Sequence, residues 1–491
     1  MRSKTSSALV PHRKITMLLF AAHFFVIIIS AAHILLRPNR QPESRAAWLV
    51  LVFALPFIGA LMYFFLGRTN IGHERSQKLR QAFSALPRPD TPQAVNLAET
   101  QPCADRYAAL FKVGESISGY QAVSGNSAEL MADSDATISQ MIADIDAAQD
   151  HVHLLFYIWL ADNNGTKMAE ALMRAARRGV VCRALVDNLG SREFIQSNLW
   201  KELSNAGVKT LTALGDGSPW RSLFKSRIDL RNHRKILVID NQITYCGSQN
   251  CADPAFLPKA KYAPWVDAVM RFEGPVVRQN QHLFASDWMG NGGDDITDIL
   301  LQPAKQISSG FTAQVIGTGP TFRSSAMPEL FQTLIYAAQE ELCITTPYYV
   351  PDAALQSALR ASANRGVITT LILPARNDDF AVGATSRSYY EDLLLAGVHI
   401  YEFQPGLLHT KSITVDNEVA LIGSANMDRR SFDLNYENNI LLRDKTATAQ
   451  LRERQRSYCD QSRKVTLDDV RRWSNFERIK NNALAILSPV L

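Results

Sequence analysis

Two long apolar runs open the chain. Residues 15–36 (ITMLLFAAHFFVIIISAAHILL) and 46–67 (AAWLVLVFALPFIGALMYFFLG) each hold 22 positions without a formal charge. A helix of that length can cross a hydrocarbon core of about 30 Å. Only RPNRQPESR separates the two runs, which is too short for a domain, so the pattern predicts a transmembrane helical hairpin.

A cleaved signal peptide would also place an apolar run behind basic residues. The length of the first run, and the second run that follows it at once, favour the hairpin. Eight Lys and Arg residues flank the two runs and three lie between them, and an excess of positive charge marks the cytoplasmic side of a membrane. We therefore expect residues 1–73 to be a membrane anchor with both ends in the cytoplasm.

Beyond the anchor, the hydrophobic pattern occurs twice. A polar stretch at 74–101, which contains PRPDTPQ, predicts a linker. Residues 102–303 and 304–470 then each alternate short β-branched or aromatic runs with amphipathic helical runs. This pattern predicts an α/β fold of two lobes related by a pseudo-twofold axis, each a mostly parallel sheet flanked by helices. Residues 471–491 predict an amphipathic C-terminal segment that is too short to span a membrane.

Composition narrows the class of protein. The 491 residues are 46% hydrophobic and 20% charged, as in globular proteins, and the length predicts two or three domains. A net charge of +5 is too small to indicate a nucleic acid partner. The six cysteines show neither a CxxC pair nor the spacing of zinc ligands, so no metal site is predicted.

One polar motif recurs at the same place in both halves. Residues 233–250 (HRKILVIDNQITYCGSQN) and 409–426 (HTKSITVDNEVALIGSAN) share the pattern HxKx4Dx6GSxN. Residues i and i+2 of a strand share a face, so each His lies on the same side as its Lys. The Asp-Asn pair predicts a turn that brings Gly-Ser-x-Asn back beside them. Duplication of a scaffold alone would preserve the apolar pattern but not these polar residues, so the motif predicts a functional site.

The chemistry of the motif suits a phosphodiester. Imidazole, ammonium, hydroxyl and carboxamide groups, all present twice, form a cluster rich in hydrogen-bond donors. One neutral imidazole can attack phosphorus while the other, as imidazolium, protonates the leaving oxygen. The candidate catalytic residues are His233, Lys235, Asp240, His409, Lys411 and Asp416. The two aspartates of this set fit a role in bracing the turn at least as well.

Each imidazole usually needs a carboxylate on its far nitrogen. Asp267 in WVDAVMRFEGP and Glu437 in LNYENNILL are the candidates, because one acidic residue lies in a strand-like run downstream of each motif. The candidate supporting residues are Ser248, Asn250, Asp267, Ser424, Asn426 and Glu437.

The doubled motif resembles the phospholipase D superfamily, whose members carry HxKx4D followed by GSxN in two halves. Within it, the chain is similar to bacterial cardiolipin synthases in FYIW, AARRGV, RNHRK, TPYYVPD and LAGVHIYEFQPGLLHTK. The resemblance implies transfer of a phosphatidyl group from one phosphatidylglycerol to another, which yields cardiolipin and glycerol. It implies anionic membrane lipid as partner, no cofactor, and a place in the bacterial inner membrane with the lobes in the cytoplasm.

The resemblance also implies residue roles. His233 would form a phosphohistidine, and His409 would act as acid and then as base, although the near symmetry of the halves makes this assignment a hypothesis. The Lys, Ser and Asn residues of both motifs would hold phosphate oxygens. After GSQN the first half reads CADPAFLPKAKYAPW without an extended acidic stretch, which departs from the family pattern and leaves the contacts to the acceptor glycerol open.

Other functions remain compatible with the sequence. A lipase or nuclease would use the same residues with water as the acceptor; the hairpin argues against a nuclease but not against a lipase. A scaffold without activity is disfavoured because no motif residue is missing. The first half also holds an insertion with GDGSPWRSLFKSR. Its apolar and basic side chains predict either a loop that dips into an anionic interface or a folded surface excursion. These side chains are Trp220, Leu223 and Phe224 with Arg221, Lys225 and Arg227.

Overall fold

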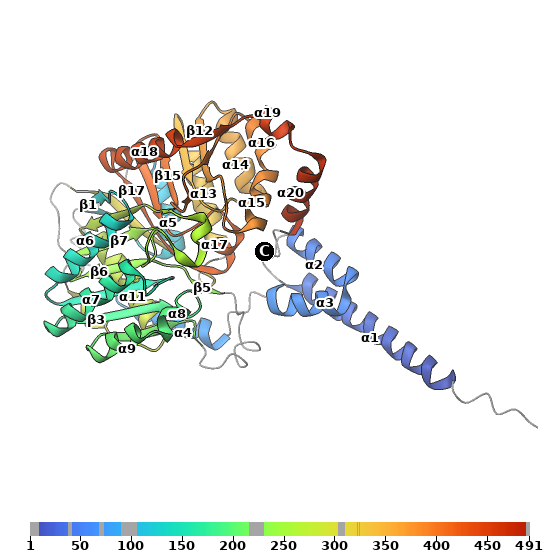
Figure 1. Ribbon diagram of the computed structural model, residues 1–491, viewed down its shortest axis with the longest axis horizontal. Coiled ribbons are helices and arrows are strands. Elements are labelled where there is room, and N and C mark those ends of the chain that lie inside the picture. The colour runs from blue at the N-terminus through green and yellow to red at the C-terminus, as the bar shows by residue number, and fades with distance from the viewer. Residues whose placement is uncertain are drawn as a thin grey trace, which may run out of the picture. The chain divides into compact units, whose positions relative to one another are not determined.

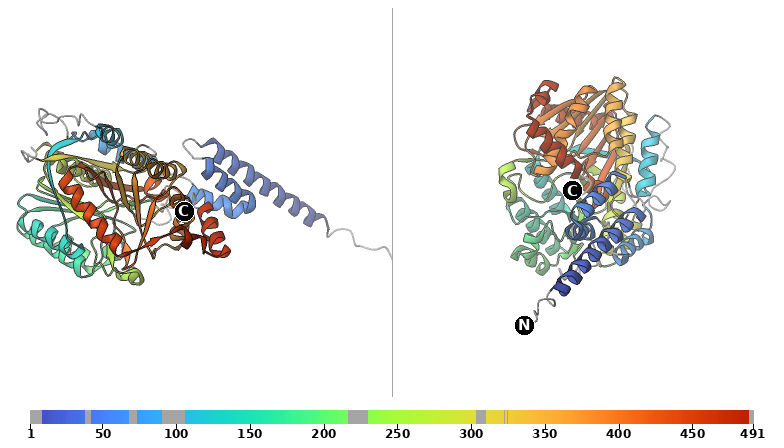
Figure 2. Two further views of the ribbon diagram at one scale, coloured as in Figure 1. Left: turned by 90° about the horizontal axis from the view of Figure 1, so that it is seen from above. Right: turned by 90° about the vertical axis from the view of Figure 1, so that its right-hand side faces the viewer.

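The computed structural model describes residues 9–37, 42–67, 73–89, 106–215, 230–302, 310–321, 323 and 325–487. The chain divides into two compact units (Figures 1 and 2). The smaller unit contains the N-terminal helices, and the larger one comprises Ile71–Gly217 and Leu230–Ala485. The insertion residues from Trp220 to Arg227 lie outside the described ranges.

The N-terminal unit is helical. Its elements are α1 (Leu9–Leu36), α2 (Pro42–Ala54), α3 (Pro56–Met62) and a π-helical turn (Tyr63–Gly67). The second apolar run is therefore interrupted: α2 ends before Pro56, which has no N–H to continue a helix and instead begins α3. A small buried cluster that includes Ile34, Trp48 and Val52 joins α1 to α2. Among the described residues, no helix combines the length and hydropathy that a membrane crossing requires.

The larger unit is built on one mixed sheet of 16 strands. The first half contributes β1 (Val123–Leu130), β2 (His151–Phe156), β3 (Val181–Asp187), β4 (Lys209–Ala213), β5 (Arg231–Asn232), β6 (Ile236–Ile239), β7 (Ile243–Gly247) and β9 (Val269–Glu273). The second half contributes β10 (Phe311–Thr318), β11 (Glu341–Thr345), β12 (Ile368–Pro374), β13 (His399–Phe403), β15 (Ser412–Val415), β16 (Val419–Gly423), β17 (Asn435–Arg443) and β18 (Ser462–Val465). Two short strands, β8 (Trp265–Val266) and β14 (Leu407–Leu408), pair separately.

The strand order repeats outward from the centre. From β1 the first half runs β1-β9-β7-β6-β2-β3-β4, and from β10 the second half runs β10-β17-β16-β15-β11-β12-β13, with β18 added at the edge. Corresponding strands thus occupy corresponding places, which gives two lobes joined where β1 pairs with β10. The pairing of β1 with β10 joins the strands of both lobes into a single sheet.

The prediction that each sheet is mostly parallel was wrong. Parallel neighbours in the main sheet are the outer β2-β3-β4 and β11-β12-β13, together with the short β5-β17 pair, whereas the other pairs are antiparallel. The Asp-Asn turn within each motif accounts for part of the antiparallel pairing. Asp240 and Asn241, like Asp416 and Asn417, have φ of 50° and 53°, and such tight turns connect antiparallel strands.

Helices cover both faces of the sheet. The first lobe and its entry contain α4 (His73–Ala85), α5 (Ala108–Ser118), α6 (Ser134–Ala147), α7 (Asn163–Arg177), α8 (Arg192–Gln196), α9 (Asn198–Asn205), a 3₁₀ turn (Leu257–Tyr262), α11 (Val276–Gly290) and α12 (Thr297–Leu301). The second contains α13 (Ala326–Ala337), α14 (Ala353–Asn364), α15 (Phe380–Ser388), α16 (Tyr390–Leu395), α17 (Arg429–Asp433), α18 (Lys445–Asp460), α19 (Leu467–Arg471) and α20 (Asn475–Leu487). In β11, Leu342 packs in the cluster of α13 and α14 whereas Cys343 packs against Tyr458 of α18, since successive strand side chains point to opposite faces.

The long helix near the end of each lobe reaches across to the other lobe. Helix α11 contacts β10 of the second lobe, and α18 contacts β1 of the first (Figure 1). A linker was predicted for residues 74–101, but all of this stretch up to Ala85 belongs to α4, which packs on α11. The lobes therefore share a core, and residues far apart in sequence are held together at their boundary.

Candidate functional site

Two short parallel strand pairs bring the motifs to the boundary between the lobes. Strand β5 pairs with β17, so that Asn232 lies opposite Tyr436, and the His233 N–H donates to the Tyr436 carbonyl at 2.9 Å. Strand β14 pairs with β8, and the His409 N–H donates to the Val266 carbonyl at 2.8 Å. One residue beyond each of these pairings, a histidine lies beside a carboxylate: His233 beside Glu437, and His409 beside Asp267.

Each histidine is bonded to a carboxylate of the opposite lobe. His233 Nδ1 lies 2.8 Å from Glu437 Oε2, and His409 Nδ1 lies 2.6 Å from Asp267 Oδ1. A carboxylate on Nδ1 fixes the proton there and leaves the Nε2 lone pair to react. The sequence identified these four residues, but the crossing between lobes became visible only in the structure.

The two motif serines hold the carboxylates. Ser248 Oγ donates to Asp267 Oδ1 at 2.6 Å, and Ser424 Oγ donates to Glu437 Oε2. The glycine before each serine is required by close packing, because a Cβ at Gly247 would collide with the Ala268 carbonyl and one at Gly423 with the Asn438 carbonyl. These hydroxyls are thus engaged with the carboxylates, whereas the resemblance implied contacts with phosphate.

The lysines supply positive charge beside the imidazoles. Lys235 Nζ donates to the His233 carbonyl and Lys411 Nζ to the His409 carbonyl, both at 2.6 Å, and both side chains are buried. An ammonium group has three donors, so two remain on each lysine for an anion. Asn250 accepts from the Ile158 N–H at 3.3 Å through Oδ1, which leaves its NH₂ group available as a donor.

Burial sets the protonation states. It lowers the pKa of both His233 and His409 to about 4, and it lowers the pKa of Lys235 to about 8 and that of Lys411 to about 7. Burial alone would raise the pKa of Asp267, but the charge and hydrogen bond of His409 outweigh it and bring that pKa to about 2. At neutral pH the free site therefore holds neutral imidazoles, ionised carboxylates and readily deprotonated ammonium groups.

Further residues complete the site without having been predicted for it. The Tyr157 ring meets the His233 ring edge-on with centroids 4.9 Å apart, and the Trp265 ring lies 4.6 Å from that of His409. Arg234, fully buried, binds Asp287 at 2.6 Å and donates to the Glu437 carbonyl at 3.2 Å. Tyr157, Trp265 and Arg234 lie in the segments FYIW, WVD and RNHRK, so their neighbourhood was visible in sequence but their contacts were not.

The two motif aspartates lie at the far end of their β-hairpins. Asp240 accepts from the backbone N–H groups of Gln149, Asp150 and His151 at 2.8–2.9 Å. Asp416 accepts likewise from the N–H groups of residues 339–341 and pairs with Arg106 at 3.2 Å. Each aspartate lies five positions after the motif lysine, which is roughly 16 Å of extended strand. The structure brings the histidines, lysines, serines and carboxylates together and places the two aspartates at loops.

Removing the Asp416 carboxylate is expected to destabilise the fold. Asp416→Ala would leave three part-buried backbone donors without their acceptor, which costs about 2–4 kcal/mol of unfolding free energy. A lower melting temperature of the full-length protein would show this. Glu418→Ala, which removes a more exposed carboxylate two residues away, is the control and should melt close to wild type. A wild-type melting temperature for Asp416→Ala would contradict the bracing role.

Comparisons with known proteins agree with this architecture. The family described as "Cardiolipin synthase, PLD-like domain" matches residues 141–288 and 331–458, and the family "Phospholipase D-nuclease N-terminal" matches residues 25–68. Cardiolipin synthase A of Salmonella arizonae and that of Salmonella paratyphi B are each 36% identical over 484 residues, covering 95% of this chain and 97% of the relative.

A solved structure shares the fold. The crystal structure of phosphatidylserine synthase from Haemophilus influenzae superposes with a TM-score of 0.54 at 14% identity, covering 74% of this chain and 95% of the other. The family matches cover both lobes and the relatives nearly the whole length, so the chain belongs to the cardiolipin synthase family of phospholipase D-like proteins.

Proposed function

We propose that this family member joins two phosphatidylglycerol molecules into cardiolipin and glycerol by two successive displacements at the boundary between the lobes. The observation that carries the mechanism is the crossed arrangement, in which His233 bonds to Glu437 and His409 bonds to Asp267. It supplies two imidazoles with free Nε2 atoms, one for each side of a phosphodiester.

In the first displacement, His233 Nε2 attacks phosphorus and forms an N–P bond. The P–O bond to glycerol breaks, and His409, protonated, gives its proton to the departing oxygen. A bound phosphodiester is an anion beside His409, and an opposite charge favours the protonated imidazole. Lys235, Lys411 and Asn250 have donors available for the non-bridging oxygens.

In the second displacement, neutral His409 takes a proton from a glycerol hydroxyl of the second phosphatidylglycerol. That oxygen attacks phosphorus, the N–P bond breaks, and His233 is restored as a neutral imidazole. One phosphodiester has replaced another, so the overall exchange needs no nucleotide. Water must be kept from the phosphohistidine, because its attack would give phosphatidic acid instead.

We also propose that residues 15–36 and 46–67 anchor the protein in the bacterial inner membrane, with the lobes on the cytoplasmic side. Apolar side chains on both segments are exposed, among them Phe20 and Phe25 of α1 and Ile58 and Leu61 of α3. The match of residues 25–68 to an N-terminal domain of the superfamily supports a distinct role for this region. Such an anchor would keep the lobes close to a substrate that resides in the bilayer.

Product analysis tests the proposed function. Purified full-length protein is incubated with phosphatidylglycerol vesicles, and cardiolipin, phosphatidic acid and glycerol are followed by mass spectrometry. Cardiolipin and glycerol in equal amounts are expected. Phosphatidic acid as the product would identify a lipase. Absence of any lipid turnover would refute both the transferase and the lipase activity.

The pH profile should reflect the perturbed side chains. With phosphatidylglycerol in neutral detergent micelles, we expect kcat/KM to fall below about pH 4, where His233 takes up a proton and its Nε2 can no longer attack phosphorus, and above pH 7 to 8, where the lysines lose the charges that attract the phosphodiester. Lys411→Arg keeps its charge throughout, so its alkaline midpoint should rise from about 7 towards the value of about 8 set by Lys235. An unchanged midpoint, as expected for exposed Lys445→Arg, would contradict the assignment.

A further inference from the structure

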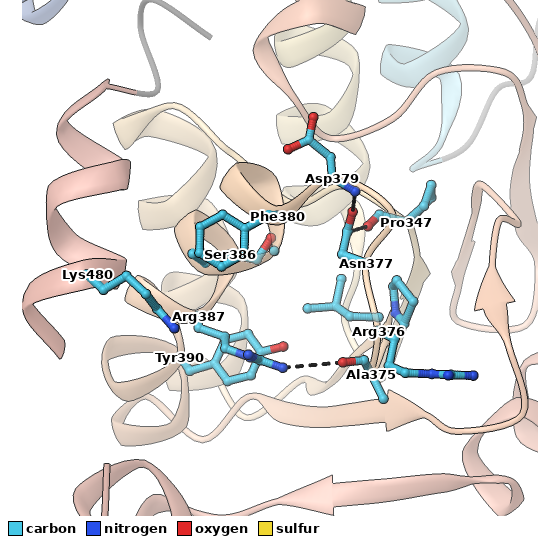
Figure 3. A pocket seen from close by; sticks show the side chains of 14 residues that line it. Pro347, Ala375, Arg376, Asn377, Asp379, Phe380, Ser386, Arg387, Tyr390 and Lys480 are labelled. Atoms are coloured by element: carbon cyan, nitrogen blue, oxygen red, sulfur yellow. Dashed lines mark hydrogen bonds between the residues drawn. The ribbon is translucent and has the colours of Figure 1, made fainter. Parts of the chain in front are cut away.

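A cavity of about 240 Å³ lies outside the histidine site. Its walls come from the carboxyl end of β12, from α15 and from α20, and they include Pro347, Ala375, Phe380, Arg387, Tyr390 and Lys480 (Figure 3). None of the motif residues or their carboxylate partners lines it. The mechanism proposed above gives this cavity no role.

The cavity carries an excess of positive charge. Lys480 reaches in from α20 and Arg387 from α15 (Figure 3). Arg387 donates to the Ala375 carbonyl at 3.3 Å and lies 3.7 Å from Glu402, whereas Lys480 has no carboxylate partner among the described residues. The acidic residue of the lining, Asp379, is engaged as the N-cap of α15, where it accepts from the Ala381 N–H at 2.9 Å. An anion entering the cavity would therefore meet Lys480 with its charge unneutralised.

Apolar side chains surround the same cavity. Phe380, in its lining, is 68% exposed, and on α20 Phe476 is 77% and Ile479 is 67% exposed. Residues 476, 479 and 480 lie on one face of the helix because they are three and four positions apart. Lys480 Nζ is 5.6 Å from the centroid of the Phe380 ring, so charge and apolar surface adjoin. Exposed apolar groups beside a basic pocket match an anionic lipid, which joins a phosphate to acyl chains.

We propose that this cavity binds the phosphate of an anionic phospholipid at the bilayer surface, with its acyl chains over Phe380, Phe476 and Ile479. The inference rests on the proposed function, since that function brings the lobes to a membrane. The bound lipid is a third one, separate from the donor and the acceptor at the histidines. It holds the second lobe against the bilayer, so that substrate lipids can reach the site without leaving the membrane.

Photo-crosslinking tests the proposal on the full-length chain. Phe380 is replaced by p-benzoylphenylalanine in a His233→Ala background that does not consume lipid, and the protein is reconstituted into vesicles of phosphatidylglycerol and phosphatidylcholine. We expect a covalent adduct with phosphatidylglycerol. The matched control carries the same group at Ile368, which is 55% exposed at the opposite end of β12, and should give little adduct.

The charge contribution is tested by Lys480→Glu, which should reduce the phosphatidylglycerol adduct at position 380 about fivefold. Equal capture of phosphatidylcholine, crosslinks to the chain's own N-terminal residues, or no adduct would each overturn the proposal. Binding of inorganic phosphate that is lost in Lys480→Glu, without any lipid adduct at position 380, would overturn the lipid as occupant and identify a site for free phosphate. Cardiolipin formation by the unmodified chain is measured in parallel: its absence refutes the proposed function, whereas an active chain without the adduct refutes this inference alone.

Discussion

His233→Ala and His409→Ala are each expected to lower cardiolipin formation by at least about 10³-fold, because each removes an imidazole that forms or breaks a bond to phosphorus or transfers the proton. Mass spectrometry of cardiolipin from phosphatidylglycerol vesicles measures the loss. His399→Ala, which removes a half-buried imidazole of β13 outside the site, is the matched control and should remain active.

The two histidines can be told apart by a substrate whose leaving group needs no proton. With a phosphatidyl p-nitrophenyl ester, His409→Ala should still release one nitrophenolate per chain in a burst, because His233 can form the phosphohistidine unaided. His233→Ala should show no burst. The reverse pattern would make His409 the nucleophile, and bursts in both variants would refute a covalent intermediate on either residue.

Glu437→Gln and Asp267→Asn are expected to lower turnover by about 10²- to 10⁴-fold, since a neutral amide on Nδ1 no longer fixes the reactive tautomer or stabilises the imidazolium. The side-chain volume is retained, so the loss reports on charge and tautomer. Glu402→Gln serves as the control. It neutralises another buried carboxylate, which lies outside the motifs and is 2.9 Å from Arg463.

The crossing of the pairs makes this prediction specific. Glu437 is bonded to His233, so Glu437→Gln should lose the nitrophenolate burst. Asp267 is bonded to His409, so Asp267→Asn should keep the burst. If each carboxylate acted on the histidine of its own half, the two results would be exchanged. Wild-type turnover in both variants would show that the carboxylates have no part in the reaction.

Local patterns were sufficient to identify the motif and its β-hairpins. His-x-Lys on one strand face, an Asp-Asn turn and a returning Gly-Ser-x-Asn depend on residues within 18 positions of one another, and strand periodicity and turn chemistry act over that range. The same patterns misjudged the direction of the strands. Apolar runs look alike in parallel and antiparallel sheets, and the pairing of the central strands is decided by which neighbours the lobes provide.

By itself, the sequence determined the two-lobed α/β organisation, the doubled motif and the four residues of the histidine–carboxylate pairs. Only the tertiary structure decided which carboxylate serves which histidine, because the partners are 204 and 142 residues apart and meet through the β5–β17 and β8–β14 pairings at the lobe boundary. It likewise decided that the serines hold carboxylates and that Asp240 and Asp416 hold loops. Turn geometry fixes the register of strands joined by a hairpin, whereas the register of these distant strands depends on how the lobes dock.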